Sequence, residues 1–93
     1  MPIVSCWLEL DLPSRTLKEK RSIVKHIVNR VRQHFNVAAA EMELQDVVGS
    51  ATLCFVTVSN DYRYAEGLLE QVVAWVERER PDVVIVEYSI EEV

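Results

Sequence analysis

The sequence predicts an α+β domain with the element order βαββαβ, built as one four-stranded antiparallel sheet with two helices on one face. Residues 3–11 alternate between apolar and polar side chains, which is typical of a strand with one covered face. Residues 17–35, and a second stretch that ends before Pro81, space their apolar residues as amphipathic helices do. Each helix lies between two strands, and two such halves close most simply into one sheet.

Length and composition indicate one small folded domain that spans residues 1–93. Hydrophobic residues make up 49% of the chain and charged residues 27%, with only 2 glycines, which is the composition of a compact domain with one core. No apolar run is long enough to cross a bilayer, and the first residues lack the features of a signal peptide. We therefore expect a cytoplasmic protein with no membrane partner.

The first strand and the first helix have clear boundaries in the sequence. In the strand, one face is apolar and the other carries Trp7 between polar residues. The apolar face consists of Val4, Cys6, Leu8 and Leu10, and the other of Ser5, Trp7, Glu9 and Asp11. Thr16 and Glu19 form a capping-box pattern, in which the hydroxyl accepts from the third helical N–H and the carboxylate reaches back to the cap N–H. This pattern predicts a helix that begins near Thr16.

The second half of the chain repeats the arrangement. Residues 36–44 and 51–59 are predicted to pair as a hairpin, and residues 83–90 form the last strand. The helix between them has Ser59, Asn60 and Asp61 as possible N-caps. Its apolar side is predicted to consist of Ala65, Leu68, Leu69, Val72 and Val76, with Trp75 partly buried at its margin. The whole is the ferredoxin-like plait, in which the first strand lies between the third and the fourth.

Several short runs resemble the signature of the bacterial YlxP-like family. They are TLKEKRS at residues 16–22, FNV at 35–37, AE at 40–41, QD at 45–46, ATL at 51–53 and VSND at 58–61. The resemblance spans nearly the whole chain and implies a small ferredoxin-like protein with no assigned enzymatic activity. It also implies members that are often encoded beside translation and ribosome-maturation factors. The predicted hairpin tip, residues 45–50, departs from the family pattern because VVGS replaces a bulkier, more polar segment.

Charge is distributed unevenly along the chain, whose formal net charge is −5. Residues 15–34 hold seven basic residues against one acid, Glu19, a net of +6, so the rest of the chain carries −11. At 100° per residue, four of these cations fall within about 60° of each other along one flank of the first helix. We call them the basic ridge: Lys18, Arg21, Lys25 and Arg32. Lys20 lies nearer the apolar stripe, and we expect its stem to pack there while the ammonium reaches solvent.

Two interpretations of the basic ridge remain open. The cations can form an ordinary solvated helix face, matched by acids from elsewhere in the chain. Alternatively, they can contact the phosphates of RNA or of a ribosomal particle, which gives affinity without sequence readout. Cations in the first turn of a helix are unfavourable, because the positive end of the helix dipole lies there. The cap at Thr16 and Glu19 starts the helix without them, so helix formation does not explain their presence.

The uncovered face of the sheet is a second candidate surface. Trp7 is expected there with Val83 and Ile85 as apolar neighbours, a patch that a second copy could cover in a homodimer. Base stacking on this face is unfavourable, because the third strand offers only Phe55 as an aromatic and carboxylates flank Trp7. The alternative function is therefore a homo-oligomeric structural or adaptor module that binds no nucleic acid.

Nothing in the sequence predicts an enzyme. It contains no nucleophile motif, phosphate loop, cofactor motif or metal-ligand spacing, so we assign no catalytic residue, cofactor, metal or small-molecule substrate. His26 and His34 are eight residues apart and point about 80° from each other, which prevents them from sharing a metal. Glu41 and Glu43 share one side of the second strand, where we expect them to discourage edge pairing. Cys6 and Cys54 are predicted to be buried, reduced thiols.

Overall fold

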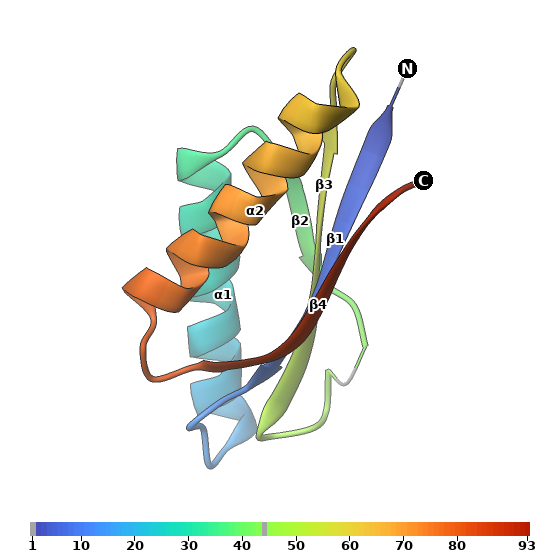
Figure 1. Ribbon diagram of the computed structural model, residues 1–93. Coiled ribbons are helices and arrows are strands. Elements are labelled where there is room, and N and C mark those ends of the chain that lie inside the picture. Colours follow the sequence, from blue (N-terminus) through green and yellow to red (C-terminus); the bar gives the residue numbers. More distant parts are fainter. Residues whose placement is uncertain (1, 44) are drawn as a thin grey trace.

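The computed structural model describes residues 2–43 and 45–93, and it has the predicted fold class. The elements are β1 (Ile3–Asp11), α1 (Leu17–His34), β2 (Ala38–Glu41), β3 (Ser50–Val58), α2 (Tyr62–Glu79) and β4 (Val84–Glu92). The sheet is antiparallel throughout and has the order β2-β3-β1-β4, so β1 lies between β3 and β4 as predicted. Both helices lie on the same side of this sheet (Figure 1).

The second strand is shorter than predicted. It covers Ala38–Glu41 where the sequence indicated residues 36–44, of which Leu44 lies outside the described residues. Residues 42–43 and 45–49 instead belong to the connection of the β2-β3 hairpin. In the described part of the chain no helix is long and apolar enough to cross a membrane.

Local side-chain contacts set the helix boundaries. The Thr16 hydroxyl accepts from the Glu19 N–H at 3.1 Å, which confirms the predicted cap of α1. The Glu19 carboxylate accepts from the N–H of Arg15 at 3.2 Å, one residue before the expected donor. In α2, Asp61 is the N-cap and accepts from the Arg63 N–H at 3.0 Å. This helix ends at Glu79, before Pro81, because proline cannot continue it.

The core lies between the sheet and the two helices. All four predicted apolar residues of β1 are buried there, and they pack with Val24, Ile27, Val28 and Val31 of α1 and with Ala65, Leu69, Val72 and Val76 of α2. Leu68 is only partly buried. Trp75 is buried more deeply than predicted, at 6% exposure, and its ring is tilted against His34 at a centroid distance of 5.5 Å.

Phe55 belongs to this core and not to the open face. It pairs with Cys6 across the β1-β3 ladder, so it shares the helix-covered side, and it is fully buried. The prediction that placed it on the uncovered face was wrong. The physical reason is that β3 is apolar on both sides, with Leu53 and Phe55 facing the helices and Cys54 facing away. Alternation therefore does not reveal which face is covered.

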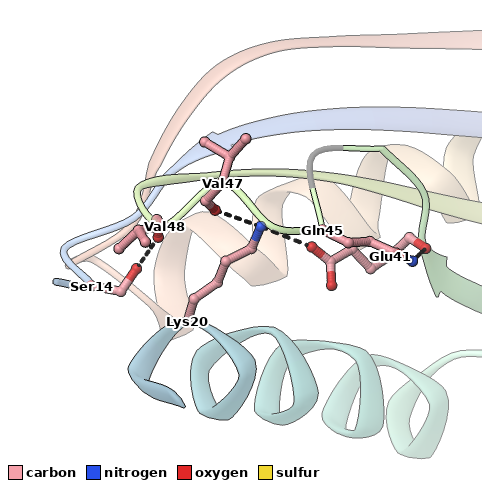
Figure 2. Close-up of polar contacts among 6 residues, drawn as sticks. All are labelled: Ser14, Lys20, Glu41, Gln45, Val47 and Val48. Atoms are coloured by element: carbon pink, nitrogen blue, oxygen red, sulfur yellow. Dashed lines mark hydrogen bonds and ion pairs between the residues drawn. The ribbon is translucent and has the colours of Figure 1, made fainter. Parts of the chain in front are cut away.

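Lys20 is the largest fully buried side chain of the protein, which contradicts the expectation that its ammonium reaches solvent. Its Nζ lies 3.1 Å from Oε2 of Glu41 and donates to the carbonyl of Val47 at 2.6 Å (Figure 2). Glu41 is itself partly buried, so it pairs inward with α1 and does not protect the strand edge as expected. The pair connects α1, the end of β2 and the β2-β3 connection.

The hairpin tip is fastened to the start of α1 by a second contact. The Ser14 hydroxyl donates to the carbonyl of Val48 at 2.6 Å, next to the Val47 carbonyl that Lys20 binds (Figure 2). Two neighbouring carbonyls of the connection thus accept from groups at the N-terminal end of α1. Residues 47 and 48 are held against the domain.

We expect the effects of substitutions at Lys20 and Glu41 on the free energy of unfolding to depend strongly on each other. Lys20→Met should lower the free energy of unfolding by about 3 kcal/mol, because it leaves a partly buried carboxylate without its cation. Lys20→Met with Glu41→Met should recover part of this loss, since no uncompensated charge then remains. Urea denaturation of both variants and of the wild type measures this. A single variant as stable as the wild type would contradict the assigned role.

Candidate functional site

The basic ridge runs along α1 beside the edge strand β2. All four of its side chains are exposed. Arg21, Lys25 and Arg32 line one groove of about 370 Å³ between this helix and β2. Its other lining residues are Val24, Val28 and Asn29 from α1 and Ala39, Ala40 and Glu41 from β2. Lys18 lies outside the groove, in a separate hollow that Glu19, Ser22 and Ile23 also line. The structure therefore brings three of the four predicted residues together.

Arg32 is positioned by the strand edge. Its guanidinium donates to the carbonyl of Ala39 at 2.6 Å. Ala38 pairs with Val56 and Ala40 with Cys54 toward β3, so the carbonyls of Ala39 and Glu41 point away from the sheet. The Glu41 carbonyl accepts from Gln45 at 3.4 Å. Both outward carbonyls of β2 are thus occupied, and Arg32 still has further N–H groups for a ligand.

The other cations of the basic ridge have no acidic partner within residues 2–43 and 45–93. The ion pairs of this part of the chain are Lys20–Glu41, Arg78–Glu79 and Arg80–Asp82. Glu41 lines the groove but pairs with Lys20, and Glu19 directly follows Lys18 in the first turn of α1. Many of the other acids lie on other surfaces. They gather on the uncovered face, at Glu9, Asp11, Glu87 and Glu91, and along α2, at Glu66, Glu70, Glu77 and Glu79. The basic ridge is therefore a locally positive surface on an acidic protein.

The uncovered sheet face differs from the prediction in its apolar residues. Trp7 lies there, half-buried, between Cys54 on β3 and Ser89 on β4. Val83 is instead buried in the core, and Ile85 pairs with Leu10 on the helix-covered side. Neither can belong to an interface with Trp7, so this prediction was wrong.

A continuous apolar run and an irregular ladder explain that error. Residues 83–86 are all apolar, so their pattern does not indicate a face. The β1-β4 register also shifts, from Glu9 opposite Glu87 to Leu10 opposite Ile85, which marks a β-bulge. After this shift, Val84 lies opposite Asp11 and shares the uncovered face.

Carboxylates make the uncovered face unfavourable for a homodimer. Glu9 lies directly opposite Glu87 on neighbouring strands, and Glu91 follows four residues further along β4 on the same face, opposite Ser5. A two-fold contact with a second copy would bring the same carboxylates from both copies into one interface. Like charges at such a contact cost several kcal/mol, about as much as burial of one tryptophan contributes.

The cysteine thiols are buried, and the histidine rings contact neighbouring side chains. Burial raises the pKa of the Cys6 thiol to about 12 and also raises the pKa of Cys54. Nδ1 of His26 lies 3.2 Å from Arg80, which binds Asp82 through two hydrogen bonds of 2.9 and 2.8 Å. The bond from Arg80 lowers the pKa of Asp82. The ring of His34 lies tilted against that of Trp75. Across the described ranges, no three His, Cys, Asp or Glu side chains are placed to hold a metal ion.

Fold and site together define a small ferredoxin-like domain with a cationic groove between its first helix and an edge strand. The chain belongs to the family described as "Protein of unknown function (DUF503)", whose model matches residues 3–90. It is 34% identical over 62 residues to the uncharacterized protein YlxP of Bacillus subtilis (strain 168), and the match covers 67% of each chain. The predicted resemblance to a YlxP-like family without assigned activity is confirmed.

The fold has a solved counterpart among designed proteins. The solution NMR structure of a de novo designed protein with a ferredoxin fold aligns with a TM-score of 0.57. The alignment covers 100% of this chain and 84% of the designed one, at 15% sequence identity. At this identity the likeness shows the fold alone, and it supports the predicted ferredoxin-like plait.

The raised thiol pKa values predict that both cysteines react slowly in the folded protein. Thiol reagents attack through the thiolate, which burial disfavours at Cys6 and Cys54. In mildly alkaline buffer, we expect a disulfide reagent such as DTNB to label both thiols far more slowly in the native protein than in urea. The absorbance of the released product follows the reaction. Equal rates in both conditions would contradict the placement of the two residues.

Proposed function

We propose that this protein is a non-enzymatic RNA-binding protein of the cytoplasm that associates with RNA or a ribosomal particle through the basic ridge. One observation carries the proposal: Lys18, Arg21 and Lys25 are exposed on one flank of α1 with no acidic partner among the described residues. Cations held apart from a protein's own carboxylates are available to phosphates. Contacts of this kind position a nucleic-acid backbone without reading its sequence.

The dimensions of the basic ridge suit a nucleic-acid strand. From Lys18 to Arg32 the helix rises about 21 Å, at about 1.5 Å per residue. Four phosphate contacts along this length would give a salt dependence with a log-log slope of about −2.8 for a single strand. The groove beside β2 adds the apolar surface of Val24 and Val28 next to the cations, where a ribose or a base edge can pack.

Segregation of charge reconciles this proposal with the net charge of −5. The acids of the uncovered face lie across the sheet from α1, and those of α2 lie on a separate helix. Their field is screened beyond about 10 Å at ordinary ionic strength. The local charge of the basic ridge therefore determines which ligands bind there. The acidic residues of the other surfaces repel polyanions from the rest of the domain.

The second candidate is an adaptor module that binds protein and no nucleic acid. A homodimer through the uncovered face has little support, since Glu9, Glu87 and Glu91 would meet their copies there. The same carboxylates favour a cationic protein partner. A protein partner on the uncovered face would not by itself block the basic ridge, because the two surfaces lie on opposite sides of the sheet.

Charge reversal on the basic ridge tests the proposal. Lys18→Glu, Arg21→Glu and Lys25→Glu together should reduce co-sedimentation with ribosomal particles by about tenfold or more, because three phosphate contacts become repulsive. Association of the wild type should also weaken as salt is raised. Sedimentation through a sucrose cushion at two salt concentrations measures both effects.

The matched control reverses three arginines outside the basic ridge. Arg30→Glu, Arg63→Glu and Arg78→Glu change the net charge by the same amount, and all three side chains are exposed. Arg30 is on the other flank of α1, and the other two are on α2. We expect this variant to co-sediment like the wild type. Equal loss in both variants, or association that salt does not weaken, contradicts the proposal.

A further inference from the structure

The two edge strands of the sheet, β2 and β4, differ in whether their outward backbone groups are occupied. At the β2 edge, Arg32 and Gln45 occupy the outward carbonyls of Ala39 and Glu41, and the strand has only 4 residues. At the other edge, β4 has 9 residues and runs without a neighbour on its outer side (Figure 1). An uncovered strand edge is a template for pairing with another chain unless something blocks it.

The ladder with β1 identifies which backbone groups of β4 are free. The N–H of Val93 donates to the carbonyl of Ile3. In an antiparallel ladder every second residue bonds to the same neighbour, so Glu91 and Ser89 also bond to β1. The intervening residues Tyr88, Ile90 and Glu92 therefore direct their N–H and C=O groups away from the sheet. Within the described residues, no side chain bonds to these groups.

The surroundings of this edge are strongly acidic. β4 itself carries Glu87, Glu91 and Glu92, and it has no lysine or arginine. On the helix-covered side, the Tyr88 hydroxyl donates to Glu70 of α2 at 3.0 Å. This bond raises the pKa of Tyr88, and it places the carboxylate of Glu70 beside β4.

We infer that the outer edge of β4 binds an extended, lysine- or arginine-rich segment of a partner protein as a fifth strand. Main-chain hydrogen bonds to Tyr88, Ile90 and Glu92 would hold the segment, as in other cases of strand addition. Carboxylates on both faces of β4 select cationic side chains, since residues two apart on the segment lie on the same face. Glu87 and Glu91 are four apart and match cations with the same spacing.

The same charges exclude other occupants of this edge. A second copy paired through its own β4 would bring three carboxylates per copy into one ladder, which opposes self-association. RNA is repelled by this surface and offers no backbone that pairs with a strand. The edge is therefore closed to copies of this chain and open to a basic segment.

A synthetic peptide tests the inference on the full chain. The probe is a nine-residue alternating Lys-Thr peptide, matched to the length of β4. In amide NMR spectra, we expect it to shift the signals of β4 and to slow hydrogen exchange at Tyr88, Ile90 and Glu92. The amides of Ser89 and Glu91 already bond to β1, so their exchange should change little.

Two controls separate main-chain pairing from charge attraction. The same peptide with every backbone nitrogen methylated keeps its charge but cannot form the ladder, and it should bind about tenfold more weakly or worse. On the protein, Glu87→Lys with Glu91→Lys should abolish binding. Glu43→Lys with Glu79→Lys makes the same change in net charge at exposed positions away from the edge and should bind the peptide only slightly less well.

Four results would overturn the inference. The first is equal binding of the methylated peptide, which would indicate charge attraction alone. The second is a set of shifted signals centred away from β4. The third is perturbation of β4 that grows with protein concentration in the absence of peptide, which would make a second copy the occupant. The fourth is the absence of any binding.

Discussion

The buried ion pair between Lys20 and Glu41 is the contact on which the proposed binding surface depends. It joins α1 to the end of β2 with a separation of 3.1 Å between Nζ and Oε2, and the same ammonium binds the hairpin connection at Val47. Removal of a lysine from water is costly unless its partners compensate for it. The pair therefore fixes how β2 lies against α1, and the groove that holds Arg21, Lys25 and Arg32 exists only in that arrangement. A stabilising contact and the proposed binding surface share one helix.

Charge segregation gives the small domain distinct surfaces. Cations lie along one flank of α1, while carboxylates occupy the uncovered face and the outer strand β4. Arg32 contributes to two of these features, because it lines the groove and also occupies an outward carbonyl of β2. The β2 edge is thereby closed by side chains, whereas the β4 edge is protected from copies of the chain by charge alone. The proposed RNA surface on α1 and the proposed site for a basic protein segment on β4 involve different elements, so they do not overlap.

The fold could be predicted from the sequence because its strongest signals are local. The alternation of β1, the helical period of α1 and the cap at Thr16 each depend on residues close in the chain, and the structure confirms them. The positions of Phe55 and Ile85 could not be predicted, because both lie in strands with consecutive apolar residues where period two does not indicate a face. The β1-β4 ladder also contains a bulge, which changes the face on which the residues of β4 before it lie, and the sequence does not reveal it.

The candidate site was predictable only in part for the same reason. The angular position of the basic ridge follows from helical geometry, but the groove requires β2 beside α1, which is a tertiary contact. Lys20 had a signal that could have been used: it follows Leu17 by three residues and precedes Val24 by four, on the apolar side of the helix. Its partner Glu41 lies in the next strand, at a distance that only the folded hairpin specifies.

The most direct measurement of the central claim is to map a short single-stranded RNA onto the protein by amide NMR. The account predicts that added RNA shifts the signals of Arg21, Lys25, Asn29, Ala39 and Ala40, which line the groove, and leaves those of Trp7, Glu87 and Ser89 unchanged. Higher salt should reverse the shifts. Shifts centred on the uncovered sheet face, or a spectrum that RNA does not change, would contradict it.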